Sequence, residues 1–247
     1  MITMQITKFP TINFGQLKFK QVKNDENKRF IFEDFSCKDR YNNDCFVSSE
    51  RSFLDDFKET VKIYDKNKNP LAENELHYYK LIKQIYNSDM KTLEELNYKK
   101  GYGTIMHLCS IMQLLENNYP LIKLCSLSKA IYFHSKMKFE PAIDNTNELI
   151  SHLQDEIIEK SPNKLKYLAE KATNLITDKS IDKEEFLKNG NKLLADYIQE
   201  IRKGKFDREK YGFLDGFTMV LTKENIIKHK DFFNKLLKDF RIDYFIK

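Results

Sequence analysis

The stretch LEELNYKKGYGTIMHLCSIMQLLENNYPLIKLCSLSKAIYFHSKMKFEP, residues 93–141, decides the fold. It contains two of the seven glycines of the chain, Gly101 and Gly103, between a short apolar run and a long run with helical spacing. Glycine permits a tight turn, and the first N–H groups of a helix have no partner inside it. A turn of this kind before a helix from Thr104 therefore predicts an anion site. A tight turn without a ligand remains the alternative, because GxG alone is common.

The residues around the turn predict an alternation of strands and helices. A short strand is expected over 90–93, and a helix that is apolar on most sides over 104–117. The continuous apolar run 121–127 is typical of an interior parallel strand. A short helix over 128–137 and a strand over 138–143 follow. Together these elements predict an α/β unit.

The segment before this unit predicts a hairpin and two helices. Residues 12–22 and 29–35 alternate between apolar and polar side chains, as the strands of a β-hairpin do. Residues 52–64 begin with a serine before acidic residues and repeat apolar positions at helical spacing. Residues 75–86 have apolar positions at intervals of three and four. We expect a helix in each of these last two ranges, although VKIY, residues 61–64, could instead be a strand.

The segment after the unit changes character. Three charge-rich amphipathic helices are predicted over 147–160, 163–177 and 182–203, separated by SPN and DKSID. Residues 213–222 return to strand-like composition, and 223–240 predict a final helix.

Composition narrows the class of protein. The 247 residues suffice for one domain with an insertion or for two small domains. Basic and acidic residues number 42 and 37 and are interleaved, so nucleic-acid binding is not expected. The four cysteines form no CxxC pair, and His77, His107, His152 and His229 have no spacing of metal ligands, so no metal is expected. No signal peptide and no apolar run of about 18 residues are present, which predicts a cytoplasmic protein without membrane contact; export without a cleaved signal stays open.

Two motifs in the opening stretch resemble those of one family. The turn YKKGYG and the helix AIYFHSKMKF are similar to the Q/R-x-x-G-x-G/A turn and the A-x-x-F-Y-x-K-x-G-F helix of the GNAT (GCN5-related N-acetyltransferase) acyltransferases. The positions that match the family are Gly101, Gly103, Ala130, Phe133, Lys136 and Phe139. The positions that depart from it are Tyr98, His134 and Lys138. The resemblance covers about fifty residues.

The resemblance implies a fold and a division of the chain. It implies an α/β (α+β) fold: a mixed central sheet of GNAT type with flanking helices. The strand over 213–222 would pack antiparallel beside the strand over 138–143. The core would then comprise residues 1–144 and 205–247, and residues 145–204 would be a helical insertion.

The resemblance also implies an activity, an acetyl-CoA-dependent N-acyltransferase in which the amine attacks the thioester directly. The acceptor would be an amine-bearing small molecule or protein, the cosubstrate acetyl-CoA, and no metal would take part; homodimerisation is left open. Backbone of the strand end would pair with the pantetheine, and the turn would hold the pyrophosphate. The residues assigned to the cosubstrate are Leu93, Lys99, Lys100, Gly101, Tyr102, Gly103, Thr104 and Ser128.

Three residues are candidates for the chemistry. His134 takes the position of the family tyrosine that protonates the departing thiolate, and Glu94 or Glu95 would accept the amine proton. A structural histidine and solvated carboxylates are the alternatives. Because of the departures from the motif, a second hypothesis stands beside catalysis: a GNAT-type module that binds coenzyme A or another protein without turnover.

Overall fold

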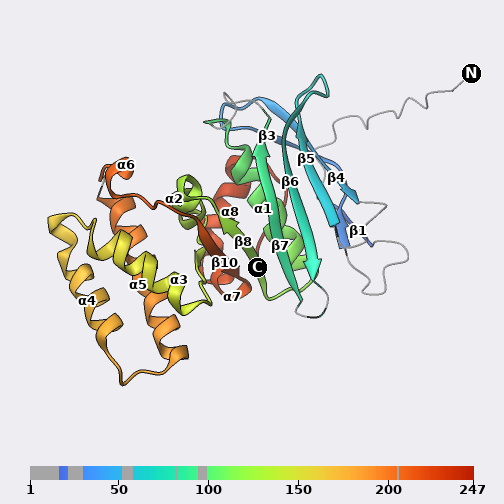
Figure 1. Ribbon diagram of the computed structural model, residues 1–247. Helices are drawn as coiled ribbons and strands as arrows, with labels where there is room; N and C mark the ends of the chain where they lie inside the picture. Colours follow the sequence, from blue (N-terminus) through green and yellow to red (C-terminus); the bar gives the residue numbers. More distant parts are fainter. Residues whose placement is uncertain are drawn as a thin grey trace, which may run out of the picture.

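The computed structural model describes residues 17–21, 30–51, 58–79, 81, 83–93, 99–204 and 206–247. This part of the chain forms an eight-stranded sheet, a separate two-stranded hairpin, and helices that cover the sheet and extend from one end of it (Figure 1). The order in the large sheet is β3-β4-β5-β6-β7-β8-β10-β9. The predicted fold class, an α/β protein with a mixed central sheet, is confirmed.

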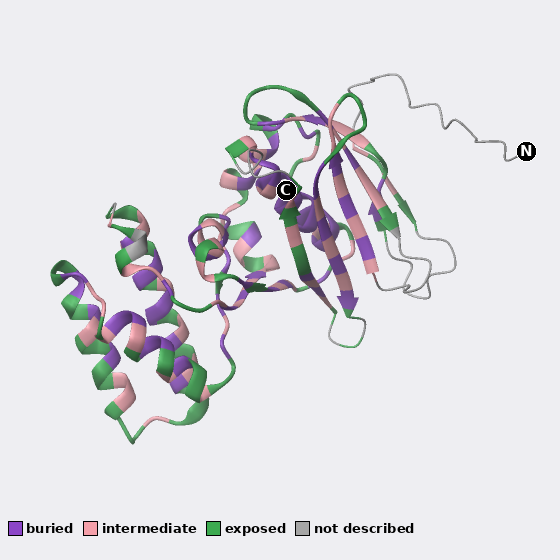
Figure 2. Cartoon of the chain, turned by 45° about the horizontal axis from the view of Figure 1, so that its top comes forward, coloured by how far each residue is buried: buried purple, intermediate pink, exposed green. Residues whose placement is uncertain are grey.

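One half of the sheet is an antiparallel meander. Its strands are β3 (Phe35–Lys38), β4 (Asp44–Arg51), β5 (Lys58–Tyr64), β6 (Pro70–Tyr79) and β7 (Gln84–Thr92). Buried and partly exposed residues alternate along β5 and β6, as the bands in Figure 2 show. The outer face carries cross-strand ion pairs such as Lys58–Glu75, at 2.8 Å. The meander therefore buries one face and leaves the other in water.

The two helices predicted in this half are wrong. Residues 58–64 form β5, and residues 52–57 lie outside the described part. Residues 75–86 are divided between the end of β6 and the start of β7. Both ranges also alternate between buried and partly exposed side chains, as strands do. Val61 and Ile63 point into the core on alternate positions, as do Leu76 and Tyr78. This alternation, and not the helical spacing, decides the structure.

The other half of the sheet contains the predicted α/β unit. Strand β8 (Leu121–Ser126) pairs parallel with β7 and antiparallel with β10 (Phe217–Thr222), which confirms an interior strand. β10 also pairs antiparallel with β9 (Glu140–Pro141). The predicted strand over 90–93 is the end of the longer β7, and the strand over 138–143 shrinks to two residues.

Helix α1 (Tyr102–Glu116) lies across the buried face of the sheet and contacts β5, β6, β7 and β8. It is buried from Thr104 to Leu114, which explains why its sequence is apolar on most sides. The hairpin of β1 (Phe19–Gln21) and β2 (Phe30–Phe32) adjoins it, as predicted within the described residues. The predicted final helix breaks at His229 into two shorter ones. These are α7 (Lys223–Lys228) and α8 (Lys230–Asp239).

The helices between β9 and β10 form what we call the helical unit, residues 145–211. Its elements are α3 (Thr146–His152), the π-helix η3 (Leu153–Ile158), η4 (Asn163–Leu165), α4 (Lys166–Thr177), α5 (Lys183–Lys203) and α6 (Arg208–Tyr211). They stand together beside the β10–β9 end of the sheet (Figure 1). The three predicted helices are present, although the first continues as a π-helix. Side chains of Asn145 and Asp182 cap α3 and α5.

Candidate functional site

The only parallel strand pair in the described sheet separates partway along its length. β7 and β8 are paired from Gln84–Leu121 to Asn87–Leu124. The register of β7 against β6 then shifts, because Asn87 lies opposite Leu76 while Asp89 lies opposite Glu75. The extra residue, Ser88, forms a β-bulge, and a bulge bends a strand and increases its twist. We call the diverging ends, residues 88–92 of β7 and 125–126 of β8, the splay.

The turn after the splay packs both of its glycines against aromatic rings. Gly101 has a φ of 91°, and a Cβ there would lie 2.9 Å from the ring of Phe240. A Cβ on Gly103 would lie 3.1 Å from Cζ of Phe133 in α2 (Ile131–Lys136). The backbone of the turn thus lies directly against neighbouring rings, and the left-handed conformation at Gly101 favours glycine.

The N-terminus of α1 has the electrostatics of an anion site. The Gly101 carbonyl accepts the first bonds of the helix, from the N–H groups of Thr104 and Ile105 at 3.0 and 3.1 Å. The amides of Tyr102 and Gly103 therefore precede the first intrahelical donor. No side chain caps the helix, and its first turn holds no acidic residue. The positive end of the helix dipole is thus not neutralised by a cap or by a first-turn carboxylate, which favours an anion there.

Most of the residues that the resemblance assigned to the cosubstrate are consecutive and lie in the turn and the start of α1. Gly101, Tyr102 and Thr104 are buried in the turn, Gly103 and Lys100 are half-buried, and Lys99 is exposed. Ser128 is half-buried, two residues beyond the end of β8.

The end of β7 differs in one respect from the expectation that its backbone pairs with the pantetheine. The N–H of Leu93 donates to the carbonyl of Leu71 at 3.0 Å, so this group is not available to a ligand. Successive N–H groups of a strand point to opposite sides, which directs that of Thr92 toward the splay. Glu94 and Glu95, the candidate bases, lie outside the described residues.

His134 lies in a buried aromatic cluster under the turn. Its Nδ1 is 2.9 Å from Nε2 of His107 in α1. His107 stacks on Phe133 with ring centroids 5.3 Å apart and contacts Phe139 at 4.8 Å. His107 is fully buried, and His134 is 8% exposed. No spacing in the sequence predicts this contact between two histidines on different helices.

Burial sets the charge of this histidine pair. Desolvation lowers the pKa of His134 to about 4. It lowers the pKa of His107 well below the ordinary value, and the neighbouring His134 adds to that shift. Both rings are therefore neutral at pH 7, and one donates its N–H to the other. The catalytic role assigned to His134 stays a prediction, and any proton it gives must come from a neutral imidazole.

A second buried polar group lies where the parallel strands part. Nδ2 atoms of Asn74 and Asn87 lie 3.3 and 3.5 Å from Oγ of Ser110 in α1. Within the described residues the Oδ1 atoms of both asparagines are buried without a partner. Two unpaired acceptors can receive hydrogen bonds from water or from an amine. Asn74 and Asn87 could have been identified from the sequence if β6 and β7 had been predicted as strands, because the alternation along each strand places these side chains on the buried face.

Neither a metal site nor a membrane-spanning helix is present in the described part of the chain. Among the residues that the structure describes, no group of three or more His, Cys, Asp or Glu side chains is arranged to hold a metal ion. In the same part of the chain, no helix has the length and apolar character needed to cross a membrane.

Comparisons with known proteins give matches among solved structures alone. No family model and no curated protein matches the chain. GCN5 from Tetrahymena matches with 16% identity and a TM-score of 0.34 over 38% of this chain and 59% of the Tetrahymena chain. A mutant spermidine/spermine N-acetyltransferase SpeG from Vibrio cholerae matches with 10% identity and a TM-score of 0.38 over 71% of this chain and 72% of the other. SpeG in complex with CoA and spermine matches with 15% identity and a TM-score of 0.30, over 34% and 51%.

The strand arrangement can be set beside the sheet that the resemblance of the two motifs implies. An antiparallel meander leads into one parallel pair, β7 and β8, which separates at a bulge. A glycine turn and the uncapped helix α1 connect the two strands of that pair. The next strand, β9, is joined to β8 through the inserted antiparallel β10. These features agree with the mixed central sheet that the two motifs led us to expect.

Proposed function

We propose that the chain is an acetyl-CoA-dependent N-acyltransferase that transfers an acetyl group to an amine. One observation carries the proposal: the uncapped N-terminus of α1 opens next to the splay, directly after Lys99 and Lys100. Coenzyme A combines a pyrophosphate with a pantetheine arm that has amide groups. The amides of the turn suit the pyrophosphate, and the unpaired edge of β7 at Thr92 suits the arm.

The proposed reaction is a single displacement. The amine nitrogen bonds to the thioester carbon, the C–S bond breaks, the ammonium gives up one proton, and the thiolate gains one. The protein would position the two substrates and assist both proton transfers. We assign the base to Glu94 or Glu95. We assign to His134, whose Nδ1 faces His107, a hydrogen bond from an imidazole N–H to the departing sulfur, and its proton transfer to that sulfur requires that His134 be protonated first.

A second candidate function follows from the same histidine. A neutral, buried imidazole with a pKa of about 4 is a weak source of protons at pH 7. This observation favours a module that binds coenzyme A without turnover. Both functions require the same coenzyme A site, and they differ only in whether the acetyl group is transferred.

We also propose the division of the chain that the resemblance implies. Residues 1–144 and 205–247 would form the acyltransferase core, and residues 145–204 an insertion. The support is that β10 pairs on one side with β8 and on the other with β9, although the helical unit separates it from both in sequence. The helical unit would then border the side where the acceptor enters.

Binding is tested with a matched pair of substitutions at Gly103. Gly103→Glu and Gly103→Gln add side chains of equal size beside Phe133, but only glutamate adds charge. A carboxylate roughly 6 Å from a pyrophosphate charge repels it by about 2.8 kcal/mol at an effective dielectric constant of 20. In isothermal titration with acetyl-CoA, the glutamate variant should bind at least about tenfold more weakly than the glutamine variant. Equal affinities would reject an anion site at this turn.

Two further measurements separate the alternatives. Pantetheine, which lacks the pyrophosphate, should bind far more weakly than acetyl-CoA. Release of free thiol from acetyl-CoA with amine acceptors then distinguishes the enzyme from the module. Binding without release on any acceptor supports the module, whereas absence of binding contradicts both.

A further inference from the structure

The contact between His107 and His134 constrains where the two rings carry their hydrogens. Nε2 of His107 lies 2.9 Å from Nδ1 of His134, which is a hydrogen-bond distance. One of these nitrogens must carry the hydrogen, and the other must be bare. The geometry alone therefore allows at most one charged ring. Because burial lowers the pKa of each histidine, both rings are neutral at pH 7.

Only two arrangements of hydrogens satisfy this contact. A neutral imidazole carries one hydrogen, either on Nδ1 or on Nε2. If His107 donates from Nε2, its Nδ1 is bare, and His134, which accepts on Nδ1, carries its hydrogen on Nε2. If His134 donates from Nδ1, its Nε2 is bare, and His107 carries its hydrogen on Nδ1. The two rings therefore have the same tautomer, which is Nε2–H in the first arrangement and Nδ1–H in the second.

The surroundings of His107 favour the first arrangement. This ring is fully buried, and the rings of Phe133 and Phe139 contact it at centroid distances of 5.3 and 4.8 Å. Its Nδ1 is buried and has no hydrogen-bond partner among the described residues. Among buried backbone groups, an N–H without a partner is rarer than an acceptor with an unused lone pair. We apply the same rule to the ring, so Nδ1 of His107 is bare and its hydrogen is on Nε2.

The surroundings of His134 favour the same arrangement. This ring is 8% exposed, and its Nε2 is not among the described side-chain atoms that are buried without a partner. In the first arrangement this nitrogen carries an N–H, which water or a ligand can accept. The Nε2–H form is also the more stable tautomer of a neutral histidine side chain in water, and the first arrangement gives both rings that form.

We propose that His107 is a positioning residue, which donates a hydrogen bond from its Nε2 to Nδ1 of His134, so that His134 presents an N–H at Nε2. The bond holds the ring of His134 in one orientation. Hydrogen bonds in a chain polarise one another, which makes the outer N–H a stronger donor. His134 therefore offers a hydrogen-bond donor, and not a base, at this nitrogen.

This distribution of hydrogens limits what His134 can do in the proposed acyltransfer. An N–H at Nε2 can donate to the departing sulfur, but it cannot take the proton of the amine. The acceptor of that proton must then be another group, which agrees with the assignment of the base to Glu94 or Glu95. The role at the sulfur rests on the proposed function, whereas the distribution of hydrogens over the two rings does not.

The first test is NMR of the full chain at pH 7 with ¹⁵N in its histidine rings. Ring nitrogens that carry a hydrogen differ widely in chemical shift from bare ones, and a scalar coupling joins the two nitrogens of an N–H···N bond. The single variants His107→Leu and His134→Leu identify the signals. We expect a bare Nδ1 and an N–H at Nε2 in both rings, with a coupling between Nε2 of His107 and Nδ1 of His134. An N–H at Nδ1 in both rings, or the absence of this coupling, would overturn the proposal.

The second test is thiol release from acetyl-CoA by a matched pair of variants. The amide N–H of His107→Gln can donate in place of the imidazole, whereas His107→Leu has a similar size and no donor. His107→Leu should lower kcat about two- to tenfold, the range that one hydrogen bond provides, and should change the affinity for acetyl-CoA less than about twofold. His107→Gln should recover most of the rate, and His77→Leu, on the outer face of β6, should keep it.

The outcomes keep this inference apart from the proposed function. A wild-type rate in His107→Leu, or equal losses in the leucine and glutamine variants, would overturn the positioning role. Circular dichroism checks that each variant is folded. If the wild type releases no thiol with any amine, the acyltransferase is rejected, and the NMR experiment alone decides the distribution of hydrogens.

Discussion

Acid should destabilise this protein through the buried pair His107–His134. Burial lowers the pKa of His134 from an ordinary value near 6.5 to about 4, while the unfolded chain keeps the ordinary value. Between these values the unfolded state binds a proton that the folded state excludes. The contribution of the neutral His134 to the free energy of unfolding is therefore fully present above about pH 6.5, and it is lost as the pH falls toward 4.

The magnitude follows from the proton balance. Each bound proton changes the free energy of unfolding by about 1.36 kcal/mol per pH unit, so His134 alone removes roughly 2 kcal/mol between pH 7 and pH 5. The pKa of His107 is lowered in the same direction, and that histidine adds to the loss. Two kcal/mol is a large share of the stability of an ordinary domain.

Urea unfolding followed by far-ultraviolet circular dichroism measures this effect, since the chain has no tryptophan to serve as a fluorescence probe. The wild type and the double variant His107→Leu/His134→Leu are compared at pH 7 and pH 5. The variant should lose at least about 2 kcal/mol less than the wild type over this interval. His77→Leu, on the outer face of β6 and outside this pair, is the matched control for the loss of a histidine side chain. Identical pH dependence in all three proteins would refute the reasoning.

Three other substitutions test separate contacts. Gly216→Ala places a methyl group on the backbone carbonyl of Ser126, which cannot move aside. The free energy of unfolding in urea should therefore fall by at least about 1–3 kcal/mol. An unchanged midpoint of urea unfolding would contradict this contact. Glu156→Gln leaves Lys160 without its anion and should lower the free energy of unfolding by about 1–3 kcal/mol. If the lone charge of Lys160 is the cause, the double variant Glu156→Gln/Lys160→Met should recover part of this loss. His134→Ala should lower the rate of thiol release far more than the affinity for acetyl-CoA, and an unchanged rate would remove the catalytic assignment.

The α/β unit was predictable because its signals are local. Gly101 and Gly103 mark a turn that only a small residue can make, and the apolar content of residues 104–117 and 121–127 reports burial directly. The helices of the helical unit were also predictable, because amphipathic spacing and caps such as Asp182 lie within each segment. Such features can be recognised in a sequence without knowing which elements pack against them.

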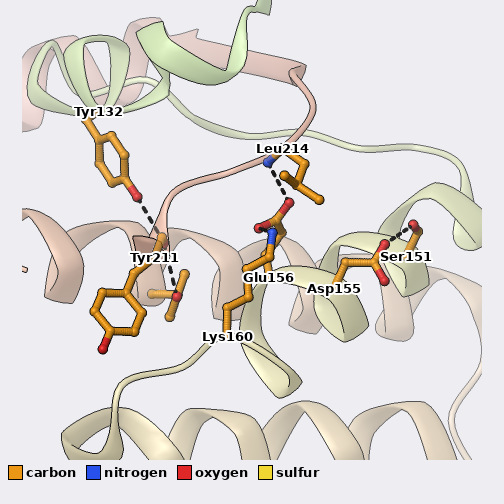
Figure 3. Close-up of polar contacts among 8 residues, drawn as sticks. Tyr132, Ser151, Asp155, Glu156, Lys160, Tyr211 and Leu214 are labelled. Carbon is orange, nitrogen blue, oxygen red and sulfur yellow. Dashed lines mark hydrogen bonds and ion pairs between the residues drawn. The ribbon is translucent and has the colours of Figure 1, made fainter. Parts of the chain in front are cut away.

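The meander and the histidine pair were not predictable in the same way. β5 and β6 contain polar residues on their buried face, such as Glu59 and Asn74, which blur the period of two that defines a strand. The contact of His107 with His134 depends on how α1 and α2 cross, which no spacing in the sequence encodes. The hydrogen bond from the N–H of Leu214 to Glu156 likewise joins η3 to a loop that is distant in sequence (Figure 3).

The position of β10 has a consequence for how the chain folds. It is the last strand in sequence but an inner strand of the sheet, between β8 and β9. Until it has been synthesised, the backbone groups along one edge of β8 have no strand to pair with, while the helical unit can already form from local contacts. We expect insertion of β10 to be the late, slow step of folding, and chains that end before Phe217 to aggregate through that edge.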